Sequence, residues 1–367
     1  MIVQLREEAT NLYEKHFNEI SDASSITKAC TVAPGRVNLI GEHVDYTGGF
    51  VFPIAIEYST VVVGSLFVKD ESGDGEARIV STSSDSVVEF PLVQDVKPFE
   101  KSNSWANYVI GVVLEYLSDV MAAFGEGKKL YLQAAIAGNV PLGSGLSSSA
   151  ALEVAFATLL EAFAEPIATK VGGNEKQRAI DRAVKCQHAE NTFCHVPCGI
   201  MDQFVSSAGL SNSALLIDCE SNDFVPVQLG GTFEDEKNAP IIVVTNSNVK
   251  HSHADGEYPV RVAQCKGATE ALQKVNSSIK SLRYATFEDL KKAKGDMTDL
   301  IYRRAKHVIS ENERTLAAKE AFGKGDVIKF GELMNGSHES MKNDYEVSSR
   351  ELLFSIYIFS KFSHGNL

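Results

Sequence analysis

A glycine- and serine-rich segment at residues 138–150, Gly-Asn-Val-Pro-Leu-Gly-Ser-Gly-Leu-Ser-Ser-Ser-Ala, most constrains the fold of this chain. The apolar run before it, Tyr131–Ala137, predicts a strand. Residues 146–164, which follow, contain neither glycine nor proline and predict a buried helix. We therefore expect a strand, a tight glycine turn and a helix N-terminus in succession.

Such a helix N-terminus can bind phosphate, because its first amides lack partners within the helix and the helix dipole adds positive charge there. Gly143 and Gly145 would let the backbone approach closely, and the hydroxyl groups of residues 147–149 could cap the helix, contact phosphate or bind a metal. The usual P-loop is excluded, since no Gly-Lys-Ser/Thr follows and residues 130–169 contain no lysine. A serine-capped core helix is the alternative interpretation.

The composition is that of an ordinary globular protein, with 367 residues of which 44% are hydrophobic and 23% charged, enough for about two domains. A net charge of −13 argues against nucleic acid or an anionic membrane as the main partner. No run of 18 apolar residues is present, and charged residues at positions 6–8 interrupt the place where a signal peptide has its apolar core. We therefore expect a cytoplasmic protein.

Six cysteines are scattered along the chain without the dense spacing of a disulfide framework, so we expect them to be reduced. One group has the ligand types that zinc prefers: Cys186, His188, Cys194, His195 and Cys198. Its spacing matches no established zinc pattern. Ordinary buried or half-buried side chains are the favoured interpretation, with zinc as the alternative.

The segment at residues 30–53 carries the densest group of polar side chains. Four of them lie among its glycines: Arg36, Glu42, His43 and Asp45. A rigid turn with these groups suits a polyhydroxylated ligand, because carboxylates accept hydrogen bonds from neighbouring hydroxyl groups while histidine or arginine donates. A solvated loop is the alternative.

Asp202 lies between a glycine turn and an apolar run, where partial burial could tune its carboxyl group as a base. A structural Asx-turn is the alternative. Elsewhere the patterns predict helices within 1–27 and at 174–191, 257–275, 286–293, 298–323 and 325–338, and buried strands at 215–218 and 241–244. The acidic segment 233–238 is the predicted domain boundary.

Three separated segments together resemble the galactokinases, within the GHMP family of small-molecule kinases. They are Gly-Arg-Val-Asn-Leu-Ile-Gly-Glu-His-Val-Asp-Tyr at 35–46, the glycine-serine loop at 141–150, and Cys-Gly-Ile-Met-Asp-Gln at 198–203. The likeness covers residues 30–354. It implies an α+β, two-domain GHMP kinase fold. Residues 1–231 would form an N-terminal domain like ribosomal protein S5 domain 2, and residues 232–367 a ferredoxin-like α/β sandwich domain.

The resemblance implies ATP-dependent phosphorylation of galactose at its anomeric hydroxyl, giving galactose 1-phosphate as in the Leloir pathway, with the active site between the domains. The positions that would surround the sugar are Arg36, Glu42, His43, Asp45, Gly199, Asp202 and Tyr258. Asp202 would be the catalytic base, and Arg36 would keep Asp202 ionised and stabilise charge on the transferred group.

By the same resemblance, the ATP phosphates would be held by Pro141, Leu142, Gly143, Ser144, Gly145, Leu146, Ser147, Ser148 and Ser149. Mg²⁺ would lie near Ser149 and Glu190. The expected partner is a small sugar, and we expect a monomer that could self-associate through its second domain.

The sequence departs from the family after residue 348, because the expected glycine-rich strand motif and last strands do not follow and residues 355–367 resemble no part of the family. We therefore expect an incomplete second domain and a truncated or alternatively read product. Two other functions stay open: a sensor that binds galactose and ATP without useful turnover, and an N-acetylgalactosamine kinase. Residues 47–50 and 246–251 favour galactose over the second of these.

Overall fold

The computed structural model describes residues 1–18, 20–100, 104–125, 127–164, 174–228, 230, 241–246 and 257–353. The chain forms two compact units, Met1–Val37 with Ala55–Gly209, and Asn38–Ile54 with Leu210–Leu367. The predicted boundary at residues 231 and 232 lies outside the described residues and stays a prediction, as does every expectation for residues 355–367.

The first unit is a mixed sheet with helices on both faces. Its elements are α1 (Ile2–His16), β1 (Ser25–Asn38), β3 (Pro53–Lys69), β4 (Gly75–Ser81), β5 (Ser84–Leu92), α2 (Ala106–Phe124), β6 (Lys129–Gly138), α3 (Ser148–Phe163), α5 (Glu175–Thr192) and α6 (Met201–Ala208); Asn38 and the first two residues of β3 are assigned to the second unit. Strand β3 pairs antiparallel with β6 and also pairs with β1, β6 runs parallel to β4, and β4 pairs antiparallel with β5. The α+β fold class predicted from the sequence is confirmed.

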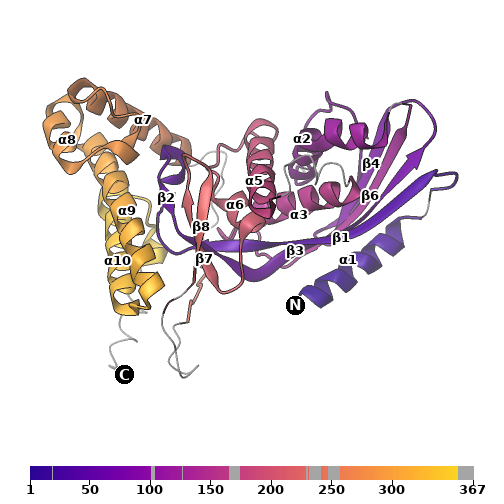
Figure 1. The fold of residues 1–367 in the computed structure, drawn as a ribbon, viewed down its shortest axis with the longest axis horizontal. Helices are drawn as coiled ribbons and strands as arrows, with labels where there is room; N and C mark the ends of the chain where they lie inside the picture. Colours follow the sequence, from indigo (N-terminus) through magenta and orange to yellow (C-terminus); the bar gives the residue numbers. More distant parts are fainter. Residues whose placement is uncertain are drawn as a thin grey trace. The chain divides into compact units, whose positions relative to one another are not determined.

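Side chains alternate between the two faces of this sheet, as strand geometry requires. Val62 and Ile136, which are opposite each other in the register of β3 and β6, belong to the main core with α2, α3 and α5. Their neighbours Val61 and Ala137 pack against α1 on the other face, around Leu5. Figure 1 shows α1 on the opposite side of the strands from α2 and α3.

Helix α2 is the only described helix that is long and apolar enough, by length and composition, to cross a membrane. Half of its most apolar window is buried inside the protein. Val109, Ile110 and Val113 of this helix belong to the main core, so its apolar composition is accounted for by packing against the sheet and its companion helices.

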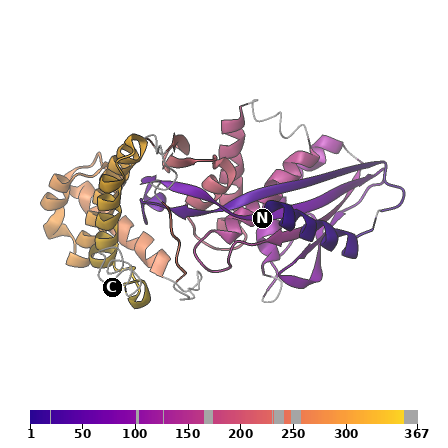
Figure 2. The same cartoon turned by 90° about the horizontal axis from the view of Figure 1, so that it is seen from below.

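The second unit combines a small antiparallel sheet with a group of helices. Its elements are the 3₁₀ turn η1 (Asp45–Thr47), β2 (Phe50–Val51), β7 (Ser213–Asp218), β8 (Asp223–Gln228), α7 (Glu257–Val275), η4 (Leu282–Tyr284), α8 (Phe287–Lys292), η5 (Ala293–Asp296), α9 (Asp299–Lys324), α10 (Val327–Ser340) and the π-helical turn η6 (Met341–Tyr345). Strand β7 pairs with β2 on one side and β8 on the other. Helix α9 packs against α7 and α10. Figure 2 shows the helices of the last third of the chain, coloured orange to yellow, gathered in one group.

The predicted helix at 298–323 is confirmed as α9, because Thr298 caps its N-terminus and Gly325 ends it in the left-handed conformation. The predicted buried strand at 241–244 is wrong. Residues 241–246 form no regular element, and Ile241 and Val243 are 84% and 69% exposed. No described strand pairs with the segment, so its apolar run does not produce β-structure.

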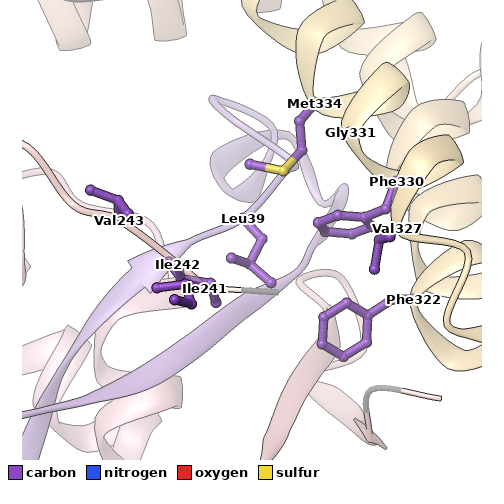
Figure 3. Close-up of a pocket in the computed structure, with 9 residues that line it drawn as sticks. All are labelled: Leu39, Ile241, Ile242, Val243, Phe322, Val327, Phe330, Gly331 and Met334. Carbon is purple, nitrogen blue, oxygen red and sulfur yellow. The ribbon is translucent and has the colours of Figure 1, made fainter. Parts of the chain in front are cut away.

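An apolar pocket of about 330 Å³ lies within the second unit (Figure 3). Phe322, Val327, Phe330 and Met334 of α9 and α10 line it, together with Leu39 and residues 241–243. The lining has no charged side chain, so this pocket is unsuited to a sugar or a nucleotide phosphate.

Candidate active site

The glycine-serine segment forms the predicted turn between a strand and a helix. Strand β6 ends at Gly138 and α3 begins at Ser148. Gly143 and Gly145 have φ of +66° and +77°, and apart from the adjacent residues no described atom lies within 4 Å of where a Cβ would stand on either. Conformation, and not crowding, therefore requires glycine at both positions. Within the described structure the Ser147 side chain does not cap α3, which removes the support for a serine-capped core helix.

Arg36, at the end of β1, joins this turn to Asp202 in the first turn of α6. Its Nε and Nη2 atoms lie 2.8 and 2.6 Å from Asp202 Oδ1, and Nη1 donates to the Gly145 carbonyl at 2.5 Å. Ser147 Oγ donates to Asp202 Oδ2 at 2.5 Å. The Arg36 and Asp202 side chains are 14% and 27% exposed, so both remain accessible to a ligand. The structure thus brings the two predicted catalytic side chains together at the glycine turn.

Gly35 permits this close approach between β1 and the turn. The Arg36 amide donates to the Leu146 carbonyl at 3.1 Å, and a Cβ on Gly35 would stand 2.6 Å from that same oxygen. Any larger residue at position 35 would push the turn away from β1. The first glycine of the predicted sugar-binding segment therefore packs against the glycine turn at residues 141–149.

Glu190 lies beside Ser149, and their side chains are hydrogen-bonded. Burial, and then the negative charge of Asp202, raise the pKa of Glu190 to about 7. A hydroxyl and a carboxylate are oxygen ligands of the kind that Mg²⁺ accepts, and Mg²⁺ in nucleotide sites commonly takes only one or two carboxylates from the protein. The two residues therefore fit a Mg²⁺ ion.

Sequence reasoning missed the buried polar groups behind Glu190. Gln203 Nε2 donates to Glu190 Oε2 at 2.6 Å and to Glu153 Oε2 at 3.0 Å. Glu153 is fully buried, and its Oε1 atom has no hydrogen-bond partner among the described residues. Burial raises the pKa of Glu153 well above its usual value. A glutamate inside the apolar run of α3 was the available sequence signal.

Replacing Glu190 by glutamine is expected to stabilise the metal-free protein at pH 8, since a buried carboxylate is replaced by a neutral group. In the wild type, the Glu190 carboxylate takes up a proton near pH 7 in the folded state and near pH 4.5 in the unfolded state. The advantage of the variant, on the order of 3 kcal/mol at pH 8, should therefore shrink as the pH falls toward 4.5. Thermal unfolding in EDTA at pH 8 and pH 5 measures this difference in stability. A stability advantage of Glu190→Gln that grows on acidification would contradict the raised pKa of Glu190.

In the second unit, Glu42, His43 and Asp45 lie on the short connection between β1 and β2. Asn38 Nδ2 donates to Glu42 Oε1 at 3.0 Å, and Asp45 begins the turn η1. Gly41 has φ +99°, and its Cβ would stand 2.6 Å from the Phe50 carbonyl. The connection is therefore a fixed turn with polar side chains, as predicted, and not an extended solvated loop.

His43 is held as a neutral imidazole. Its Nδ1 lies 3.3 Å from Tyr46 Oη, and its ring lies 5.1 Å from that of Tyr345. Burial, with the nearby His307 and Arg261, lowers the pKa of His43 to about 3. A neutral ring has one N–H donor and one acceptor nitrogen, which suits a sugar hydroxyl, since such a hydroxyl can both donate and accept.

The His43 ring is expected to stay neutral from pH 8 down to pH 5, because the folded protein protonates it only near pH 3. Acidification below about pH 6.5 therefore opposes folding, as the unfolded histidine binds a proton that the folded one does not. NMR of the imidazole ring, with His43→Asn to assign the signal, should show no titration in this range. A midpoint close to 6.5 would contradict the assignment of a neutral ring.

The structure describes the remaining predicted site residues in less detail. Gly199 is buried two residues before the start of α6. Tyr258 lies in the first turn of α7, although its side chain is outside the described residues. Leu142 is 77% exposed, and Ser144 Oγ donates to the Pro141 carbonyl at 2.7 Å. Among the described residues, no three histidine, cysteine, aspartate or glutamate side chains converge on a metal position, so the zinc alternative has no support.

The comparisons with known proteins agree with these observations. Residues 12–66 match the family model "Galactokinase galactose-binding signature", and residues 107–210 match "GHMP kinases N terminal domain". Galactokinases of Bos taurus and Homo sapiens are each 42% identical over 325 residues, covering 87% of this chain and 74% of theirs. That of Actinobacillus pleuropneumoniae is 37% identical over 338 residues, covering 91% and 79%. The crystal structure of Lactococcus lactis galactokinase complexed with galactose superposes with a TM-score of 0.73 at 29% identity, covering 94% of this chain and 81% of that one.

Proposed function

The chain belongs to the galactokinase family of GHMP kinases, and we infer from this that it is an ATP-dependent kinase that phosphorylates galactose. The main structural support for this reaction is the Arg36–Asp202 ion pair, which lies beside the glycine turn at the N-terminus of α3. Phosphoryl transfer to a hydroxyl requires an in-line arrangement, neutralised phosphate charge and a group that takes the proton.

Asp202 is the proposed proton acceptor. The anomeric hydroxyl of galactose would give its proton to an Asp202 oxygen while its own oxygen attacks the γ-phosphorus and the bond to ADP breaks. The Oδ1 atom of Asp202 faces two nitrogen atoms of Arg36, whereas Oδ2 accepts one hydrogen bond, from Ser147, and so keeps a lone pair for the sugar. The Arg36 guanidinium would hold Asp202 ionised and offset charge on the transferred group.

The turn at residues 141–149 is proposed to hold the ATP phosphates, supported by the two left-handed glycines and the N-terminus of α3. Ser149 and Glu190 would hold Mg²⁺, which when bound neutralises the β- and γ-phosphate charge. Glu42, His43 and Asp45 would recognise the sugar hydroxyls, with Glu42 and His43 toward the primary hydroxyl and Asp45 toward the ring hydroxyls. Gly199 and Tyr258 are proposed to complete the sugar site.

We also propose that the protein is a cytoplasmic monomer, which its six free cysteines support as far as the compartment is concerned. The two alternative functions are not favoured. A sensor without turnover has no need of an intact Arg36–Asp202 pair, and the family matches name galactose rather than N-acetylgalactosamine.

Initial rates of ADP formation with ATP and Mg²⁺ test the proposal on a panel of three sugars. Galactose should be turned over, N-acetylgalactosamine should react at least about 100 times more slowly, and 1-deoxygalactose, which lacks the anomeric oxygen, should be inert. Equal rates with both hydroxylated sugars would replace the galactose assignment. Turnover of 1-deoxygalactose would exclude the anomeric hydroxyl as the acceptor.

A further inference from the structure

Helix α9 holds the backbone of the connection between β1 and β2 through three polar side chains on two successive turns. His307 Nε2 lies 3.0 Å from the Glu42 carbonyl, and Asn312 Oδ1 accepts from the Phe50 amide at 2.9 Å. Between them in sequence, Glu311 accepts from the amides of Gly41 and Glu42. One helix therefore fixes both ends of the connection that carries His43 and Asp45.

Glu311 is the centre of this arrangement. Its side chain is fully buried. Its Oε1 accepts from the Gly41 and Glu42 amides at 3.0 and 3.2 Å and from Ser337 Oγ at 2.6 Å. Its Oε2 accepts from Arg314 Nε at 2.8 Å. Glu311 is the acceptor in each of these hydrogen bonds, so the surroundings of its side chain suit a carboxylate.

The backbone at Gly41 and the side chains of α9 are closely packed. Gly41 has φ +99°, and a Cβ there would also stand 3.2 Å from Thr315 Oγ1, one helical turn beyond Glu311. His307 is fully buried, with burial lowering its pKa, and its second ring nitrogen lies 2.9 Å from Ser340 Oγ. The turn at Gly41 is therefore pressed against α9 and depends on its acceptors for its amides.

We propose that Glu311 is a positioning residue for sugar recognition: its carboxylate fixes the Gly41–Glu42 backbone and thereby the direction in which Glu42 and His43 present their side chains. This inference rests on the proposed function, because it assigns Glu311 to the galactose site and not to the ATP site. The glycine turn at residues 141–149 belongs to the other unit, and among the described residues it shares none of these contacts.

The test is Glu311→Gln, which preserves size and replaces one acceptor oxygen by an NH₂ donor. In either amide orientation this NH₂ faces donors, the backbone amides on one side or Arg314 on the other. The galactose KM should rise about tenfold, while the KM for ATP changes by less than about twofold. Hydrogen exchange at residues 39–49 should become faster. An unchanged galactose KM in a folded variant would overturn the proposal, as would equal increases in both KM values.

Removing the opposing donor should rescue the variant. In Glu311→Gln with Arg314→Ala, the amide NH₂ can face the vacated space and the oxygen can accept from the connection again. The galactose KM should return to within about threefold of the wild type. Glu313→Gln, the same change on an exposed residue of α9, is the control and should leave both KM values unaltered. Failure of the rescue would assign Glu311 a merely structural role.

The proposed function and the positioning role of Glu311 can be disproved by different results. If the wild type does not phosphorylate galactose, the proposed function is wrong whatever Glu311 does. If the wild type is active and Glu311→Gln accelerates exchange at residues 39–49 without raising the galactose KM, the function stands and the positioning role is overturned.

Discussion

Asp202→Asn is expected to lower kcat with galactose by at least about 100-fold, because asparagine cannot accept the proton that leaves the sugar hydroxyl. The substitution preserves shape, but its amide loses the charged pair with Arg36, whose Nε and Nη2 atoms both contact Asp202 Oδ1. Initial rates at saturating ATP and galactose measure the effect. The loss should be in kcat, since the carboxylate is proposed to act in the reaction step.

Binding measurements separate this catalytic loss from misfolding. Asp202→Asn should still bind a nonhydrolysable ATP analogue, because the glycine turn and the N-terminus of α3 are unchanged. Asp95→Asn, the same change at an exposed position of the first unit, is the matched control and should keep full activity. A kcat for Asp202→Asn within about threefold of the wild type would remove Asp202 from the reaction.

Gly41→Ala should have the largest effect on stability. The glycine has φ +99°, and a Cβ would stand 2.6 Å from the Phe50 carbonyl oxygen and 2.8 Å from Val51 Cα. Both neighbours are backbone atoms of β2 and cannot move aside independently. We expect a loss of about 2–4 kcal/mol in the free energy of unfolding, seen as a fall of about 5–10 °C in the thermal midpoint, with weakened galactose binding.

A second glycine provides the control for Gly41→Ala. Gly267 lies within α7, and apart from the neighbouring backbone of the helix no described atom lies within 4 Å of where a Cβ would stand. Gly267→Ala should be neutral or stabilising by up to about 1 kcal/mol, since alanine favours the helix. If both variants unfold at the wild-type temperature, the crowding around Gly41 is not a constraint on the fold.

The local structure of the glycine turn at residues 141–149 could be predicted because its signals are local. A strand, two glycines and an apolar helix follow one another in the sequence, and the structure has β6, left-handed Gly143 and Gly145, and α3 in that order. The hydrogen bonds from Ser147 to Asp202 and from Arg36 to Gly145 could not be predicted from the residues alone. They join positions 55 and 109 residues apart, and the fold alone decides such contacts.

The supporting side chains of α9 were missed for a related reason. In the sequence, His307, Glu311 and Asn312 are polar residues in a segment of helix formers, where polar positions ordinarily face solvent. The structure buries all three against the β1–β2 connection. The apolar run at 241–244 was wrongly predicted to be a buried strand, because hydrophobicity predicts burial only where a partner strand or helix is available.

The identity of the product tests the central claim most directly. Purified protein incubated with ATP, Mg²⁺ and galactose should give a phosphorus NMR signal that coincides with added authentic galactose 1-phosphate, and Asp202→Asn should give at least about 100-fold less of it in the same time. Phosphate on any other hydroxyl of the sugar, or equal product from the wild type and Asp202→Asn, would contradict the account.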